Sequence, residues 1–335
     1  MISKKRHLML WGTAGLRYGS DAELPGTARI VLADAAHLAA VRAAGLVGPH
    51  TVVFVPGDPD EDTGPQVVNY GGSLSEAGAE AVLDEAFYLQ IQSYGLSEYM
   101  SVAGPTMIRI ADESDFEVFL HDADRALATG EFPDFLTNPI IQLADLPGLG
   151  ATGLADGPRQ RLYVAADGTV SVSPGGSPLG RLGDPLTRLE AAFAETGVSC
   201  LGAAVPEDVR RNALADRPWL GRYLAAVDAI RAMRARGVSP VRVSGFGGRL
   251  LPSMDGVADR TDPDLPLVLW TATSAYVHSP LTGRTFAVGH SAAQTVEAFV
   301  ACGSVTEAAG HVGRERVDRI IADFDGVGVL TAVAR

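Results

Sequence analysis

The 335-residue sequence lacks the features of a membrane or secreted protein. No apolar run approaches the roughly 20 residues that a membrane-spanning helix needs. The basic start Lys4-Lys5-Arg6 is followed only by a short apolar stretch, Leu8 to Trp11, which is too short for the core of a secretory signal. Without an export signal, the two cysteines, Cys200 and Cys302, are expected to be buried thiols rather than a disulfide. The sequence therefore predicts a soluble, cytoplasmic protein with no membrane partner.

Positive charge is scarce and is not concentrated in any segment. The chain has 27 basic and 40 acidic residues, a net charge of −13. The acidic excess is largest in residues 1–130, with 18 acidic and 8 basic side chains, whereas residues 265–335 have 6 and 5. Nucleic-acid-binding proteins usually present a basic face, because neutralising phosphates supplies most of their affinity. We therefore expect no nucleic-acid partner.

Common catalytic and metal-binding motifs are also missing. The seven histidines form no His-Glu-x-x-His motif, and the two cysteines form no Cys-x-x-Cys motif. The tripeptide Gly289-His290-Ser291 is superficially similar to a nucleophile motif, but the sequence has no Gly-x-Ser-x-Gly elbow. Ser291, followed by Gln294, is predicted to cap a helix instead. We expect no catalytic residue, no metal and no cofactor.

Two loops have a composition that could suit a ligand, but neither has the complete motif. The acidic tract 57–65 has carboxylates at spacings that can bind calcium, yet it lacks the glycine and glutamate positions of an EF-hand. The glycine cluster at 244–249, Ser-Gly-Phe-Gly-Gly-Arg, lacks the lysine of a nucleotide P-loop and the third glycine of a dinucleotide site. A solvated loop and a tight turn are the favoured interpretations.

The first 130 residues have the pattern of an acidic α/β domain. A β-branched strand at 29–33, a helix at 34–44 and a second strand at 51–55 follow one another with short connections, which predicts parallel pairing. Helices are predicted at 75–92 and 114–128. Phe87, Ile91 and Tyr94 recur at helical spacing near the end of the first of these, and we expect them to be core residues.

The middle region, residues 131–252, is predicted to be α/β as well. A hairpin is expected over 161–172, around the turn Asp167-Gly168. Pro218 marks the start of a helix that ends near Gly237, with an apolar face that includes Trp219 and Tyr223. A short strand follows at 241–243. The polar, turn-rich segment 253–265 is the predicted linker.

Residues 266–335 have the clearest local pattern in the chain. Three strands are expected at 267–270, 275–278 and 285–288, followed by three helices. Capping boxes begin the first helix at Ser291 and the second at Ser304. The third helix begins near Arg314, and Gly326 and Gly328 are expected to end it. The prediction is a winged-helix-like domain with a three-stranded antiparallel sheet and three helices, which makes the whole chain an α/β and α+β multidomain protein.

A winged-helix-like domain can place a helix in the DNA major groove, or it can leave a strand edge open to an extended peptide. The third helix carries Arg314, Arg316 and Arg319, but acidic residues interleave with them. The low local charge and the acidic remainder of the chain favour a peptide.

The run from Ala275-Tyr276-Val277-His278-Ser279-Pro280-Leu281-Thr282-Gly283 through Val288 to Val329-Leu330 resembles a RiPP recognition element. These domains bind peptides in pathways of ribosomally synthesised, post-translationally modified peptides. The whole chain resembles the larger recognition proteins of daptide-type clusters, through Asp167-Gly168-Thr169-Val170, 219–224 (Trp-Leu-Gly-Arg-Tyr-Leu) and 243–250 (Val-Ser-Gly-Phe-Gly-Gly-Arg-Leu). This resemblance implies two partners, the leader of a precursor peptide and the enzymes that modify it.

In that family the leader adds to the third strand and packs against the third helix. Carried over to this sequence, the resemblance implies a binding site formed by Thr285, Phe286, Ala287, Val288, Val317, Ile320, Ile321 and Phe324. These apolar residues could equally form the core of the domain. Two other functions stay open, a peptide-modifying enzyme of unknown chemistry and a winged-helix transcriptional regulator.

Overall fold

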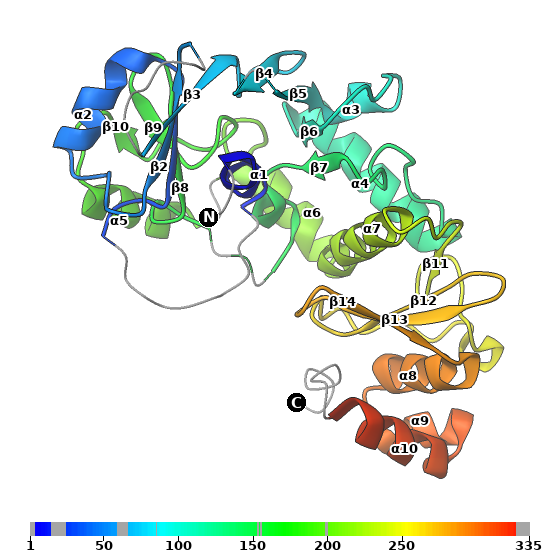
Figure 1. Ribbon diagram of the computed structural model, residues 1–335. Helices are drawn as coiled ribbons and strands as arrows, with labels where there is room; N and C mark the ends of the chain where they lie inside the picture. Colours follow the sequence, from blue (N-terminus) through cyan, green and yellow to red (C-terminus); the bar gives the residue numbers. More distant parts are fainter. Residues whose placement is uncertain are drawn as a thin grey trace. The chain divides into compact units, whose positions relative to one another are not determined.

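The computed structural model describes residues 4–14, 25–58, 66–84, 86–152, 154, 156–197 and 200–325. The chain divides into two compact units that interleave in sequence (Figure 1). Unit 1 comprises Met1–Phe119 and Ile140–Asp216, and unit 2 comprises Leu120–Pro139 and Arg217–Arg335. Helix α4 (Glu113–Thr129) passes from one unit to the other. The α/β class predicted from the sequence is confirmed.

Unit 1 is built on a mixed sheet of ten strands in the order β10-β9-β8-β1-β2-β3-β4-β5-β6-β7. The strands are β1 (Arg29–Leu32), β2 (Val52–Pro56), β3 (Val67–Gly72), β4 (Glu80–Leu83), β5 (Phe87–Ser93), β6 (Thr106–Arg109), β7 (Ile141–Leu143), β8 (Arg161–Val164), β9 (Thr169–Ser171) and β10 (Gly180–Arg181). Strands β4 and β9 run antiparallel to both of their neighbours, and the other pairs are parallel. The parallel pairing of β1 with β2 and the hairpin of β8 with β9 are as the sequence predicts.

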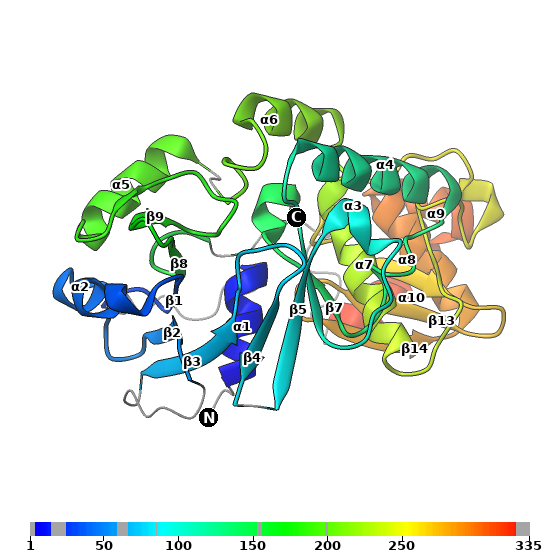
Figure 2. The same cartoon turned by 90° about the horizontal axis from the view of Figure 1, so that it is seen from above.

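Helix α1 (Lys4–Thr13) packs on one face of this sheet and holds its two halves together (Figure 2). Leu8 and Trp11 are fully buried in a core that includes residues of β1, β2, β5, β6 and β8. A Cβ atom at Gly12 would lie 2.1 Å from Met107 Cε, so a larger residue here would require the end of the Met107 side chain to move. The sequence gives no helix prediction for this segment, whose first three residues are all basic.

The helix predicted at 75–92 is wrong, because this segment forms the antiparallel pair β4 and β5. Ala81 and Leu83, like Leu89 and Ile91, alternate toward the core, which is the period of a strand. The predicted helix at 114–128 is confirmed as α4. The remaining helices of unit 1 are α2 (Leu38–Ala43), α3 (Tyr94–Ser97), α5 (Leu186–Thr196) and α6 (Glu207–Asp216), with 3₁₀ turns at Ala35–His37 and Leu146–Leu149.

Unit 2 contains a second sheet, and this sheet has four antiparallel strands rather than the predicted three. Its strands, in spatial order, are β11 (Arg242–Val243), β12 (Leu267–Trp270), β13 (Ala275–Ser279) and β14 (Arg284–Val288). The extra strand is the short one predicted at 241–243, which pairs with β12. The helices are α7 (Leu220–Arg234), α8 (His290–Cys302), α9 (Val305–Val312) and α10 (Arg314–Asp325), with a 3₁₀ turn at Pro252–Met254.

One of the two predicted helix caps is confirmed. Ser304 caps α9 by accepting a hydrogen bond from the Glu307 amide at 3.2 Å, and its hydroxyl contacts the Glu307 carboxylate. The prediction for Ser291 is wrong, because α8 begins one residue earlier, at His290, with Gly289 as the N-cap and no side-chain cap. Gly326 and Gly328, predicted to end α10, lie outside the described residues.

The core of unit 2 lies between its sheet and the three C-terminal helices. Ala275 and Val277 of β13 pack in one cluster with residues of α8, α9 and α10. The segment 253–265, for which the sequence predicts a linker, contributes the fully buried Met254 and Leu265 to the same cluster. This segment is therefore an integral part of the unit's packing.

Candidate peptide-binding edge

Strand β14 is the last strand of its sheet, and in the described part of the chain no strand pairs with its outer side. An unpaired strand edge presents backbone donors and acceptors that another chain can join. The other three sheet edges of the molecule are β10, β7 and β11, with lengths of two, three and two residues. Strand β14 has five residues. Among the edges that the described residues form, it is the one long enough to pair an extended peptide over several residues.

The hydrogen-bonding register shows which residues of β14 face this open side. The Thr271 amide donates to the Ser274 carbonyl at 2.9 Å, which makes these two residues a hydrogen-bonded pair. Hydrogen-bonded and non-hydrogen-bonded pairs alternate along antiparallel strands. It follows that Ala275 directs its N–H and C=O toward its β14 partner, Val288, rather than toward β12.

The same alternation continues along β14. Phe286 is in a hydrogen-bonded pair with Val277, whereas Thr285 and Ala287 are in the non-hydrogen-bonded pairs with β13. The N–H and C=O groups of Thr285 and Ala287 therefore point outward, to the open edge. Two of the four residues predicted on this strand thus supply backbone groups for pairing.

Side chains of the other two predicted strand residues lie on the core face of the sheet. Phe286 and Val288 are half-buried and pack against the unit 2 core. The rings of Phe286 and Phe324 meet edge to face, with centroids 6.3 Å apart, which joins the edge strand directly to α10. The guanidinium of the exposed Arg284 lies 5.9 Å from the Phe286 centroid. The open edge therefore borders an aromatic and aliphatic surface with a cation at one end.

The four predicted residues of α10 divide into two kinds. Val317, Ile320 and Phe324 are 0, 6 and 7% exposed and belong to the core of the unit. Ile321 is half-buried and packs at the margin of that core. Ile321 is therefore the one of these four residues whose side chain both contacts the core and stays partly accessible.

The polar face of α10 is occupied by ion pairs within the helix. Arg314 Nε lies 2.9 Å from Asp318 Oδ1, and Arg319 Nη2 lies 2.7 Å from Glu315 Oε1, both at i,i+4 spacing. All four side chains are well exposed. This pairing reduces the free positive charge that a helix would need to bind DNA phosphates.

The glycine cluster at 244–249 forms a turn that is fastened to α8 by a buried carboxylate. Glu297 accepts hydrogen bonds from Ser244 Oγ at 2.5 Å, the Leu250 amide at 2.8 Å and the Leu251 amide at 2.6 Å. Burial raises the pKa of Glu297 above its usual value, although these three donors oppose the shift. The oxygens of Glu297 are thus occupied by donors in and next to the glycine cluster. We therefore interpret the cluster as a structural turn, as the sequence predicts. The anchoring role of Glu297 has no sequence motif.

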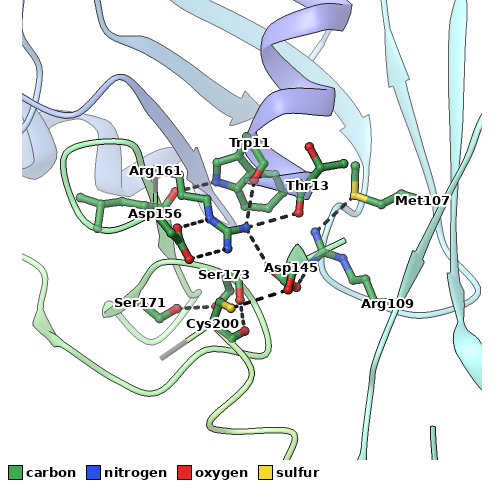
Figure 3. Close-up of polar contacts among 12 residues, drawn as sticks. Trp11, Thr13, Met107, Arg109, Asp145, Asp156, Arg161, Ser171, Ser173 and Cys200 are labelled. Carbon is green, nitrogen blue, oxygen red and sulfur yellow. Dashed lines mark hydrogen bonds and ion pairs between the residues drawn. The ribbon is translucent and has the colours of Figure 1, made fainter. Parts of the chain in front are cut away.

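Unit 1 contains a second dense group of polar residues, around Arg161 (Figure 3). Arg161 contacts Asp145 at 2.7 Å and Asp156 at 2.8 Å, and it also donates to the Trp11 carbonyl at the end of α1. Arg109 shares Asp145 at 3.2 Å. Burial alone would lower the pKa of Arg161, but Asp156 and Asp145 more than offset it and raise that pKa.

The arrangement around Arg161 suits a structural role better than catalysis. Cys200 is fully buried there, and burial raises the pKa of its thiol, which keeps it protonated and unreactive. Arg161 connects α1, β8 and the loop after β7, which are far apart in sequence. The network therefore fixes helix α1 against the sheet.

Within the described ranges, no group of three or more histidine, cysteine, aspartate or glutamate side chains is arranged to hold a metal ion. Searched over the same residues, no helix is both long and apolar enough to cross a membrane. Comparisons with protein-family models, curated proteins and solved structures find no match for this chain. The candidate site therefore depends on the geometry of β14 and α10.

Proposed function

We propose that unit 2 binds an extended peptide, which joins the sheet as a further strand beside β14. The observation that carries this proposal is the outward direction of the Thr285 and Ala287 backbone groups on a five-residue open edge. Hydrogen bonds from these groups would hold the peptide main chain, and the apolar surface beside them would select its side chains. Alternate side chains of the peptide would contact Phe286, Val288 and Ile321.

The peptide we propose is the leader of a ribosomally synthesised precursor, which this protein presents to modifying enzymes of a daptide-like pathway. Three strands followed by three helices form the C-terminal part of unit 2 in the order expected of a winged-helix-like RiPP recognition element. The open edge and the aromatic contact between Phe286 and Phe324 support this assignment. The paired arginines of α10 favour a peptide over DNA.

A proline at the edge tests the proposal in the full-length protein. Ala287→Pro removes one outward N–H without removing a bond to β13, so it should weaken leader binding by about tenfold or more, the equivalent of one or two hydrogen bonds. Binding of a fluorescent leader peptide, encoded beside the gene for this protein, is measured by anisotropy. The wild type should bind with a Kd of about 1 μM or less.

Ala287→Thr is the matched control, because it changes the same exposed side chain but keeps the N–H group. It should bind the leader as the wild type does. Hydrogen exchange of β13 and α10 shows whether each variant is folded. A folded Ala287→Pro protein with wild-type affinity would place the peptide elsewhere.

A further inference from the structure

Unit 1 contains a buried arginine, at the first position of the central strand β1, for which the described residues provide no counter-charge. Arg29 is 6% exposed, and in the described part of the chain it makes no ion pair and no side-chain hydrogen bond. Its Nε atom is buried without a partner. Burial lowers the pKa of Arg29 to about 10, which leaves the group protonated at neutral pH. A desolvated guanidinium without a partner is costly, and proteins usually pair such charges.

The neighbouring Arg161, by contrast, is paired with carboxylates. Arg29 and Arg161 are register partners on the parallel strands β1 and β8, so their side chains leave the same face of the sheet. Arg161 is paired with both Asp145 and Asp156. Among the described residues Arg29 has no equivalent carboxylate, although its position in the sheet is the same.

A second unsatisfied group lies on α1, the helix that covers the face of the sheet from which Arg29 projects. Val31, on the same face two residues further along β1, packs against Leu8 and Trp11, so this face is the one covered by α1. His7 of that helix has a buried Nδ1 atom without a partner. Its pKa is lowered by burial and then by the charge of Arg29, so the imidazole is neutral at pH 7 and can donate one N–H. The Arg29 Nε–H group and one imidazole nitrogen of His7 are thus both unsatisfied on this face.

We propose that Arg29 and His7 form a binding site for a small oxyanion, carried by a phosphate or a carboxylate group. The planar guanidinium can donate two parallel hydrogen bonds to either group, and His7 can donate a third. The bound oxyanion supplies the negative charge that Arg161 receives from Asp145 and Asp156. The near-complete burial of Arg29 admits a small ion or a terminal group rather than a nucleic-acid backbone. This site is independent of the peptide-binding edge.

Thermal unfolding of the full-length protein in sodium phosphate, sodium acetate and sodium chloride of equal ionic strength tests the proposal. Phosphate or acetate should raise the Tm of the wild type above its value in chloride, and the anion that does so identifies the source of the oxyanion. Phosphate also stabilises folded proteins in general, because it is excluded from their surface, so the increase due to the site is the part that Arg29→Met loses. Arg181→Met removes an exposed arginine of the same sheet and should keep it.

In chloride, Arg29→Met should be at least as stable as the wild type, because it replaces an unpaired buried charge with an apolar group of similar length. If Arg29→Met does not fold, calorimetric titration of Arg29→Lys with the active anion replaces it. This variant keeps the charge without the planar fork and should bind about tenfold more weakly, the loss expected for one charge-assisted hydrogen bond. Equal Tm values of the wild type in all three salts, an anion effect as large in Arg29→Met as in the wild type, or unchanged affinity in Arg29→Lys would overturn the site.

Discussion

The two sheets of this protein differ in the length of their edge strands, and the two units differ in the contacts of their buried charges. The ten-stranded sheet of unit 1 ends in strands of two and three residues, which are too short to recruit another chain. The four-stranded sheet of unit 2 ends on one side in two residues and on the other in the five residues of β14. Among the described residues, unit 1 therefore offers only short edge strands, whereas unit 2 has one long open edge.

The two units also differ in what their buried charged residues stabilise. In unit 1 the ion pairs and hydrogen bonds of Arg161 hold α1 against the sheet. In unit 2 the buried carboxylate Glu297 anchors the turn that leads away from β11, the short edge strand of its sheet. Neither network lies on β14, whose outer side is therefore bounded by backbone and apolar side chains. The predictions that follow separate the roles of these regions, beginning with the largest expected effect.

The first prediction distinguishes the core residues of α10 from the residue proposed to contact the peptide. Val317→Asp buries an unpaired carboxylate in a fully buried position and should cost several kcal/mol, enough to unfold much of unit 2. Ile321→Asp can direct its carboxylate to solvent, so unit 2 should stay folded while leader binding falls by about tenfold or more. Hydrogen exchange reports the fold and peptide anisotropy reports the affinity.

Ala322→Asp places the same charge on the exposed neighbour of Ile321 and serves as the control. It should change neither fold nor affinity. If Ile321→Asp is folded and binds as tightly as Ala322→Asp, then α10 is not part of the binding surface. The open edge of β14 would in that case need another apolar neighbour.

A second prediction tests whether the buried charges around Arg161 stabilise unit 1. Asp145→Asn keeps the shape of the side chain and suits the left-handed backbone at this position, where φ is 54°. It leaves Arg109 and Arg161 with too little negative charge, so it should destabilise unit 1 by about 3–5 kcal/mol. Urea denaturation followed by the fluorescence of Trp11, which packs in this network, measures the change.

The same substitution in an exposed ion pair provides the comparison. Asp318→Asn breaks the surface pair with Arg314 on α10 and should cost less than about 0.5 kcal/mol. Similar costs for Asp145→Asn and Asp318→Asn would show that the Arg161 network contributes little to the stability of unit 1.

Local patterns in the sequence predict the elements whose partners are near in the chain. The β1–β2 parallel pair, the β8–β9 hairpin, α4, α7 and the three C-terminal helices all follow from short-range spacing and turn residues. The segment 75–92 does not, because its alanines and glutamates favour a helix and the alternating apolar residues of β4 and β5 extend over only a few positions. Pairing with β3 and β6 in the sheet overrides that local preference.

The candidate site is only partly predictable for a related reason. The family resemblance implies the eight residues of the site, but only the register of β12, β13 and β14 shows that the Thr285 and Ala287 backbones face outward. Arg29, His7 and the Arg161 network have no local motif, because their neighbours come from strands far apart in sequence. Burial and pairing of charges appear only when the sheet is assembled.

The last prediction concerns Glu297, on the β11 side of unit 2, and its effect is the smallest of those expected at buried charges. Glu297→Gln replaces one carboxylate oxygen with an amide N–H group that faces a backbone donor, so it should cost about 1–3 kcal/mol at pH 7. The wild-type carboxyl has a raised pKa in the folded state, so folding binds a proton between the unfolded and folded pKa values. Wild-type stability should therefore decrease as pH rises through this window and recover as pH falls. Because glutamine does not titrate, the stability difference between wild type and Glu297→Gln should widen as the pH is lowered from 7 toward 4.5, the usual pKa of glutamate. A difference that stays constant, or narrows, would show that the folded carboxyl titrates at or below its usual pKa. Leader binding at β14 should be the same in both proteins at pH 7, since Glu297 anchors the turn after β11 at the opposite side of the sheet.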